Sequence, residues 1–167
     1  MSDVANESIT TRPATRADMQ AVGRLGALLV RLHHDFDPAR FIPATPQTEQ
    51  GYAAFLGSQL DAADVVILVA DVADHVVGYT YSGLEGKDYM SLRGPAGVVY
   101  DIVVDPHERG RGVGRTLLQA TLSELRHRGA SQVVLSTAQP NEQAQRLFER
   151  LGFRRTMIEM TKELGPS

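Results

Sequence analysis

The segment from Asp105 to Leu118 reads DPHERGRGVGRTLL and combines three glycines with three arginines directly before a stretch of helical apolar spacing. A loop of this kind that leads into a helix presents unpaired backbone N–H groups and the positive end of the helix dipole, which together bind an anion. It is not a P-loop, because Gly114, Arg115 and Thr116 replace the Gly-Lys-Ser/Thr sequence, and Arg115 also occupies the last glycine position of the dinucleotide fingerprint. With these two motifs excluded, the loop matches the pattern Arg-x-x-Gly-x-Gly, formed by Arg109, Gly112 and Gly114. A tight turn with solvated arginines is the alternative interpretation.

Composition limits the classes of protein to which the chain can belong. Its 167 residues, of which 43% are hydrophobic, suit one compact domain with its own core. The formal charge of −3 argues against a general nucleic-acid binder, so any anion site is local. The absence of cysteine excludes disulfides, thiolate metal sites and a cysteine nucleophile. No signal-peptide pattern and no apolar run of membrane-spanning length are found, which predicts a cytoplasmic protein without a membrane partner.

Alternating strand and helix patterns must position the loop. Hairpins are expected between the early strands and crossover helices between the middle ones, which predicts an α/β (α+β) fold. One domain is expected over residues 1–167, with a core at about 8–162 and tails at 1–7 and 163–167. The expected elements are a strand at 9–12, helices at 15–33 and 48–60, strands at 65–70, 75–83 and 98–104, a helix from 113 to the glycine at 129, a strand at 132–137, a helix from 141 to 152 and a strand at 153–161.

Two motifs in this order resemble the GNAT superfamily of N-acetyltransferases. The loop carries that family's Arg-x-x-Gly-x-Gly pattern as RGRGVG, and the segment from Asn141 to Phe153, NEQAQRLFERLGF, matches its Asn-x-x-Ala-x-x-Leu-Tyr/Phe helix ending in Gly-Phe. The resemblance implies a single-domain GNAT-like fold: a mixed, mostly antiparallel sheet with a splayed central parallel strand pair, flanked by helices. It also implies acetyl-CoA as the acyl donor and no metal.

The same resemblance assigns the cofactor contacts. The backbone of the strand before the loop would bind the pantetheine arm like an added strand, the loop would bind the pyrophosphate, and the second motif would supply contacts on the far side of the cofactor. The residues implied are Ile102, Val103 and Val104 for pantetheine, Arg109, Gly110, Arg111, Gly112, Val113, Gly114 and Arg115 for pyrophosphate, and Asn141, Phe148 and Arg150 for the far side.

Acetyl transfer to an amine needs a base, because an alkyl ammonium with a pKa of about 10.4 is not nucleophilic at neutral pH. Family members place an acidic residue at the end of the central strand, where this chain has Tyr100 and Asp101, so Asp101 is the expected base and Tyr100 its companion. A core aspartate paired with an arginine is the alternative. The N–H of Val103 is expected to stabilise the oxyanion. Phe148 replaces the family's usual proton-donating tyrosine, so either the CoA thiolate needs no acid or Tyr100 or Tyr79 supplies one.

The expected activity is direct transfer to a primary amine of a small molecule, because no cysteine is present to carry an acyl intermediate. The acidic excess of the chain favours a cationic acceptor. The acidic, aromatic segment at Asp35, Phe36 and Asp37 is one candidate wall of the acceptor site, and a solvated helix-ending loop is the alternative. A protein or peptide N-acetyltransferase and a non-catalytic acyl-CoA sensor remain as other functions. Exposed edge strands make a homodimer possible.

Overall fold

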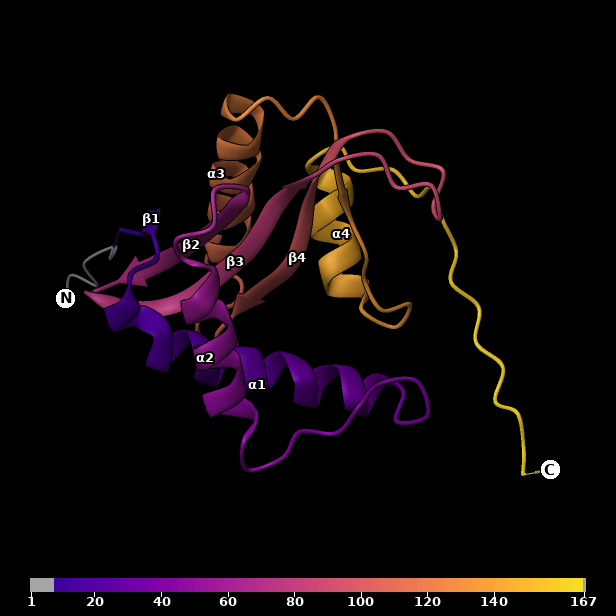
Figure 1. Ribbon diagram of the computed structural model, residues 1–167. Helices are drawn as coiled ribbons and strands as arrows, with labels where there is room; N and C mark the ends of the chain where they lie inside the picture. Colours follow the sequence, from indigo (N-terminus) through magenta and orange to yellow (C-terminus); the bar gives the residue numbers. More distant parts are fainter. Residues whose placement is uncertain (1–7, 167) are drawn as a thin grey trace.

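The computed structural model describes residues 8–166, and these form one five-stranded sheet with helices on its faces (Figure 1). The strands follow one another across the sheet in chain order: β1 (Thr10–Pro13), β2 (Val65–Val72), β3 (His75–Glu85), β4 (Ala96–Val104) and β5 (Val133–Leu135). The helices are α1 (Met19–Phe36), α2 (Thr48–Gln59), α3 (Val113–His127) and α4 (Glu142–Arg150), with short 3₁₀ turns at Arg16–Asp18 and Pro106–Glu108. The predicted tail at 1–7 lies outside the described residues.

The first four strands pair antiparallel, and β4 pairs with β5 in parallel, so the predicted mixed and mostly antiparallel sheet is confirmed. One apolar core lies between the sheet and α3 with α4, and contains Leu117, Leu118 and Phe148. A second core, around Leu25 and Leu56, joins α1 and α2 to the opposite face of the sheet. Each face therefore buries a separate set of alternating strand residues, as expected for a sheet covered on both sides.

A close approach between two helices brings an aromatic side chain to the sheet. Gly26 of α1 packs against Tyr52 of α2, and a Cβ at Gly26 would lie only 2.3 Å from the Tyr52 ring. Glycine is therefore required at this contact, since no real Cβ tolerates that distance. α1 also continues to Phe36, three residues beyond the predicted end at 33, because the first helix-breaking residue after it is Pro38.

The parallel strand pair opens next to a β-bulge. The register between β3 and β4 shifts after Tyr81, so that Asp101 pairs with Tyr81 and Val99 with Ser82, which leaves Tyr100 as the extra residue. β4 pairs with β5 only from Gly97 to Val99, and the rest of β4 has no strand on that side in the described chain. A bulge bends its strand and redirects the side chains around it. The predicted splayed parallel pair is thus confirmed.

The last predicted strand, at 153–161, is wrong. Residues 154–166 form no regular element and run away from the sheet (Figure 1). The segment has the composition of a strand, but a strand is stable only when its N–H and C=O groups pair with a neighbour, and in this structure the segment does not reach the edge of β5. For this reason the parallel pair β4 and β5 lies at the edge of the sheet and not at its centre.

Candidate active site

The glycine-rich loop forms an open concave surface at the start of α3. Gly110 and Gly112 have φ angles of 79° and 89°, in the left-handed region that favours glycine, and Gly112 is the N-cap of α3. A Cβ at either position would meet no atom within 4 Å, so space remains above the backbone. The first N–H groups of α3, beginning at Val113, have no partner within the helix and can donate to an anion. The loop therefore fits a pyrophosphate.

The cationic side chains of the loop lie at the surface. Arg109, Arg111 and Arg115 are exposed, and Arg111 pairs with Glu108. In contrast, the side chain of Val113 is buried, so only its backbone is available to a ligand. The arginines therefore add a local positive field that salt will screen, while the backbone provides the directed hydrogen bonds.

Ionic and hydrogen-bond contacts hold the loop against α1. The carboxylate of Asp105 accepts a hydrogen bond from the N–H of His107 at 3.0 Å, and Arg24 of α1 donates to the same carboxylate at 3.1 Å. This arrangement fixes the point where β4 ends and the loop begins. α1 and the loop are therefore connected across the end of the sheet.

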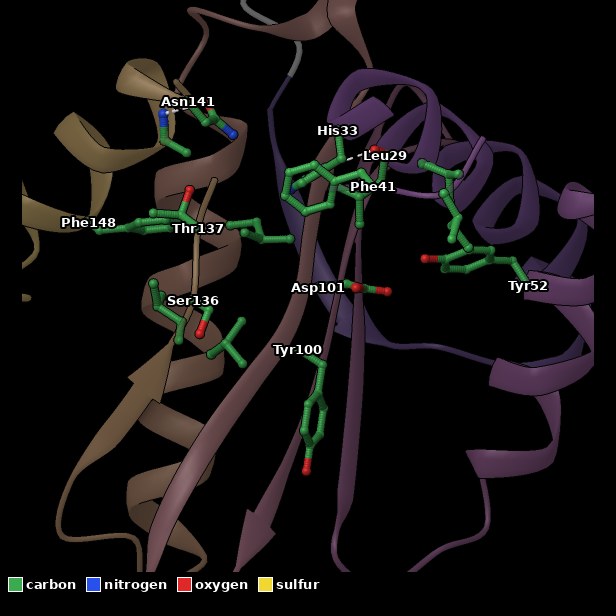
Figure 2. Close-up of a pocket in the computed structure, with 16 residues that line it drawn as sticks. Leu29, His33, Phe41, Tyr52, Tyr100, Asp101, Ser136, Thr137, Asn141 and Phe148 are labelled. Carbon is green, nitrogen blue, oxygen red and sulfur yellow. Dashed lines mark hydrogen bonds between the residues drawn. The ribbon is translucent and has the colours of Figure 1, made fainter. Parts of the chain in front are cut away.

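A cavity of about 280 Å³ lies where β4 separates from β5 (Figure 2). α1 and the segment after it contribute His33 and Phe41 to its wall, and α4 contributes Asn141 and Phe148 on the other side. Asp101 projects into the space between these walls (Figure 2). The cavity is thus lined largely by apolar side chains and by one carboxylate, that of Asp101. Small-molecule sites commonly combine apolar walls with a few polar groups in this way.

Asp101 has a hydrogen-bond partner within the sheet. Its carboxylate accepts a hydrogen bond from the hydroxyl of Tyr79 at 3.0 Å, in place of the arginine that the sequence left as an alternative. Burial raises the pKa of Asp101, while the Tyr79 hydrogen bond and the nearby His33 act in the opposite direction and only partly offset it. A carboxylate with a raised pKa is a stronger base than an exposed one. Asp101 therefore has the position and the proton affinity that a general base requires.

Tyr100, the predicted companion of Asp101, lines the cavity but directs its hydroxyl elsewhere. The hydroxyl donates to Glu85 at 2.7 Å, and Figure 2 shows it pointing away from Asp101. Burial and the bond to Glu85 raise the pKa of Tyr100, which weakens it as a proton donor. Tyr79, the other tyrosine considered, is fully buried beneath Asp101. The structure thus brings Tyr79, and not Tyr100, to the carboxylate.

The second motif forms the opposite wall of the cavity. Asn141 caps α4 by accepting the N–H of Ala144 at 3.2 Å, as its position before the helix predicted. Phe148 is only 5% exposed and packs edge-on against Phe153. Arg150 is exposed and does not line the cavity, so its predicted contact with the cofactor has no support from this arrangement.

Sequence reasoning missed the residues that α1 and α2 bring to the carboxylate. Of the two interpretations of Asp35, Phe36 and Asp37, the structure favours the solvated helix-ending loop, because both aspartates are exposed. His33 and Phe41 line the cavity instead. His33 contacts the carbonyl of Leu29 through Nδ1 at 2.9 Å, which leaves Nε2 for other contacts. The helical spacing between Leu29 and His33 places both on one face of α1, and this was the available signal for His33. Tyr52 reaches the site only through the packing at Gly26, which no local pattern reveals.

Metal sites and membrane-spanning helices are the two other features to consider. Within residues 8–166, no group of three or more His, Asp or Glu side chains is arranged to hold a metal ion. In the same part of the chain, no helix is both long enough and apolar enough to cross a membrane.

The parallel strand pair opens beside a glycine-rich helix start, and comparison with known sequences identifies the family in which this arrangement occurs. Residues 29–153 match the acetyltransferase (GNAT) family. The chain therefore belongs to this family, as the two sequence motifs predicted.

Individual relatives agree with this assignment. A mycothiol acetyltransferase of Thermobispora bispora is 42% identical over 96 residues, which represent 55% of this chain and 31% of that protein. The chain thus spans about a third of the length of this curated relative. A solved Bacillus halodurans protein matches with a TM-score of 0.78 at 22% identity, over 93% of this chain and 99% of that one. An aminoglycoside N-acetyltransferase in complex with CoA matches with a TM-score of 0.71 at 18% identity, over 95% of both chains.

Proposed function

We propose that the protein transfers the acetyl group of acetyl-CoA directly to a primary amine of a small molecule. The observation that carries the proposal is the position of Asp101: a partly buried carboxylate with a raised pKa, in a cavity that opens where β4 leaves β5. The anion-binding loop begins at the end of the same strand, so one strand connects the base to the cofactor site.

The cofactor would follow β4 from the loop to the cavity. The pyrophosphate would bind the backbone N–H groups between Gly110 and Arg115, where the glycine φ angles leave open space. The pantetheine arm would hydrogen-bond the backbone of Ile102 to Val104, which within residues 8–166 has no strand partner on the side facing β5. This path would end with the thioester beside Asp101.

The chemistry then requires one proton transfer before the acetyl group moves. Asp101 would accept a proton from the acceptor ammonium, directly or through a water molecule, and the free amine would attack the thioester carbonyl carbon. The backbone of Val103, the donor expected from the sequence, faces β3, so the N–H of Ile102, on the open side of β4, would instead stabilise the oxyanion until the C–S bond breaks and the CoA thiolate leaves. A thiol of ordinary pKa, about 8.5, is a fair leaving group at neutral pH, so the reaction does not depend on a tyrosine at Phe148.

The shape and charge of the cavity favour a small amine over a peptide. A volume of about 280 Å³, closed on one side by Phe41 and Ile42, accommodates a ring or a short chain. Asp101 supplies a negative charge that attracts a cationic acceptor. The two relatives with assigned acceptors are named for mycothiol and for aminoglycosides, both of which are small molecules. We therefore expect a small-molecule amine, with amino sugars of the aminoglycoside kind as the first acceptors to test.

Release of the CoA thiol from acetyl-CoA tests this function against a panel of aminoglycosides, polyamines, amino acids and short peptides. The protein contains no cysteine, so it contributes no thiol to the signal. Saturable release with amino sugars is the expected result. Release with peptides alone would favour the protein-acetyltransferase function. Binding of acetyl-CoA without release by any acceptor would favour the sensor function.

A further inference from the structure

Acetylation of a primary amine removes two protons from its nitrogen, and a single carboxylate can hold only one of them at a time. The acceptor begins as an ammonium, because an alkyl amine has a pKa of about 10.4. An ammonium carries three N–H bonds, and the amide product carries one. The first proton leaves before the attack, and the second leaves as the tetrahedral intermediate breaks its C–S bond. The CoA thiolate exists only after that bond has broken, so an earlier departure of the second proton needs another acceptor beside Asp101.

The lining of the cavity offers one such acceptor. Among the described residues that line it, the titratable side chains are His33 of α1, Tyr52 of α2, and Tyr100 and Asp101 of β4. Burial, with a smaller effect of Asp101, raises the pKa of Tyr52 to about 12, and burial together with Glu85 raises the pKa of Tyr100. Both tyrosines therefore keep their protons at neutral pH. Once Asp101 carries the first proton, His33 is the lining side chain that can accept the second.

The hydrogen bond of His33 determines which of its ring nitrogens is a base. Nδ1 lies 2.9 Å from the carbonyl oxygen of Leu29. A carbonyl oxygen can only accept a hydrogen bond, so Nδ1 is the nitrogen that carries the proton. In the neutral ring Nε2 is then unprotonated and can accept a proton. Histidine is also the side chain that exchanges protons most readily near neutral pH.

Two aromatic rings hold the imidazole of His33 in the cavity wall. Phe36 and Phe41 contact it edge to face, with ring centroids 6.0 Å and 5.0 Å away. Figure 2 shows His33 and Asp101 bordering the same space. The charge of His33 acts on Asp101 across this space and lowers its pKa, against the larger effect of burial. His33 itself is only partly buried, so a proton that it accepts can pass to solvent.

We propose that His33 accepts, through Nε2 and either directly or through one water molecule, the second proton that the acceptor nitrogen loses. This role rests on the acetyl transfer proposed above. In the balanced step an ammonium, acetyl-CoA, the Asp101 carboxylate and neutral His33 give an amide, the CoA thiolate, protonated Asp101 and an imidazolium. The imidazolium then releases its Nε2 proton to solvent. His33 returns to the same tautomer, because the carbonyl of Leu29 retains the proton on Nδ1.

Steady-state kinetics of two glutamine variants tests this role. His33→Gln keeps a polar side chain that cannot accept a proton, and we expect it to lower kcat for an acetylated amine by about 10²-fold. This is the lower end of the range for general base catalysis, because water in the cavity can partly replace the ring. His34→Gln is the matched control. His34 is the next residue of α1 and also contacts a carbonyl through Nδ1, that of Phe41 at 2.9 Å, but it does not line the cavity, so kcat should be retained.

Chemical rescue separates proton transfer from packing. Imidazole added to His33→Ala should restore part of kcat in a saturable manner, and the same addition should leave the rate of His34→Ala unchanged. An unchanged kcat in His33→Gln would overturn the proposal. A loss in His33→Ala that imidazole does not restore would also overturn it, and would assign His33 to packing against Phe41.

Nitrogen NMR of the imidazole rings provides a measurement that does not depend on catalysis. In the natural protein, at a pH where the ring is neutral, His33 should carry its proton on Nδ1. A proton on Nε2 would overturn the proposal whatever the activity. If the natural protein and His34→Gln both acetylate no amine, the proposed function fails and the role of His33 fails with it. An active natural protein with an equally active His33→Gln refutes the role of His33 alone.

Discussion

Replacing Asp101 by asparagine should remove the base while preserving the surrounding structure. The Asn oxygen can still accept the hydrogen bond that Tyr79 donates to the carboxylate at 3.0 Å, so the packing beneath the cavity is retained. General base catalysis contributes about 10²- to 10⁴-fold, which equals about 3 to 5 kcal/mol of activation free energy. We expect Asp101→Asn to lower kcat/KM for the amine by that factor and to leave the Kd for acetyl-CoA unchanged.

Asp101→Asn should lower activity without lowering the free energy of unfolding at neutral pH. Burial raises the pKa of Asp101 above its value in the unfolded chain. Asp101 therefore makes its full favourable contribution to the free energy of unfolding at pH values below the unfolded pKa. It is lost as the pH rises through the folded pKa, and each unit of difference represents about 1.4 kcal/mol. Asp101→Asn does not ionise. Its free energy of unfolding should therefore equal or exceed that of the natural protein at neutral pH, and the difference should disappear near pH 3.

Steady-state kinetics and urea unfolding measure these two effects. Asp64→Asn is the matched control, because it removes one negative charge from an exposed aspartate outside the cavity and should change neither kcat/KM nor stability appreciably. If Asp101→Asn retains full kcat/KM with a true acceptor, Asp101 is not the base. If the variant instead loses stability at neutral pH, the carboxylate is a structural partner of Tyr79 and the pKa argument is incorrect.

Three further substitutions test other parts of the structure. Tyr79→Phe removes a hydrogen bond that stabilises the carboxylate of Asp101, the proposed base. The acid limb of the kcat/KM profile should therefore move to higher pH, and an unmoved limb would contradict this. Gly112→Ala should weaken acetyl-CoA binding at least tenfold in calorimetry. Gly129→Ala is the control, because Gly129 has a similar φ and equally open surroundings. It should introduce the same backbone strain of about 1–2 kcal/mol without the loss of binding. Asp18→Asn breaks the ion pair with Arg12, which lowers the carboxyl pKa. It should reduce the free energy of unfolding by about 1–3 kcal/mol at pH 7. In urea titrations this difference should begin to shrink below the unfolded pKa and disappear only as the pH falls through the lower, folded pKa.

The parts of the site that the sequence predicted are those with local signals. The loop from Arg109 to Gly114 could be predicted because its closely spaced glycines stand out in the sequence. In the structure, Gly110 and Gly112 adopt the left-handed φ angles that favour glycine. Asn141 was recognised as a helix cap because capping depends on neighbours three residues away.

The parts that the sequence did not predict depend on distant contacts. Tyr52 enters the cavity wall only because Gly26 allows α2 to approach α1. Tyr79 on β3 reaches Asp101 on the neighbouring strand β4. The side chain of Tyr100 points away from Asp101 because Tyr100 is the extra residue of the bulge between β3 and β4. Its hydroxyl then donates a hydrogen bond to Glu85. The segment at 153–161 has the pattern of a strand, but whether it pairs depends on a partner edge and not on its own residues.

Mass spectrometry of the products shows whether the protein transfers an acetyl group to a small-molecule amine. The purified protein is incubated with acetyl-CoA and the amine panel, and the acceptors are analysed for the mass of one added acetyl group and for its position. The account predicts acetylation of a primary amine on a small acceptor, at a rate that falls strongly in Asp101→Asn. Acetyl-CoA that binds and raises Tm, with no acceptor gaining an acetyl group, would contradict the account and leave a protein that binds the cofactor without using it.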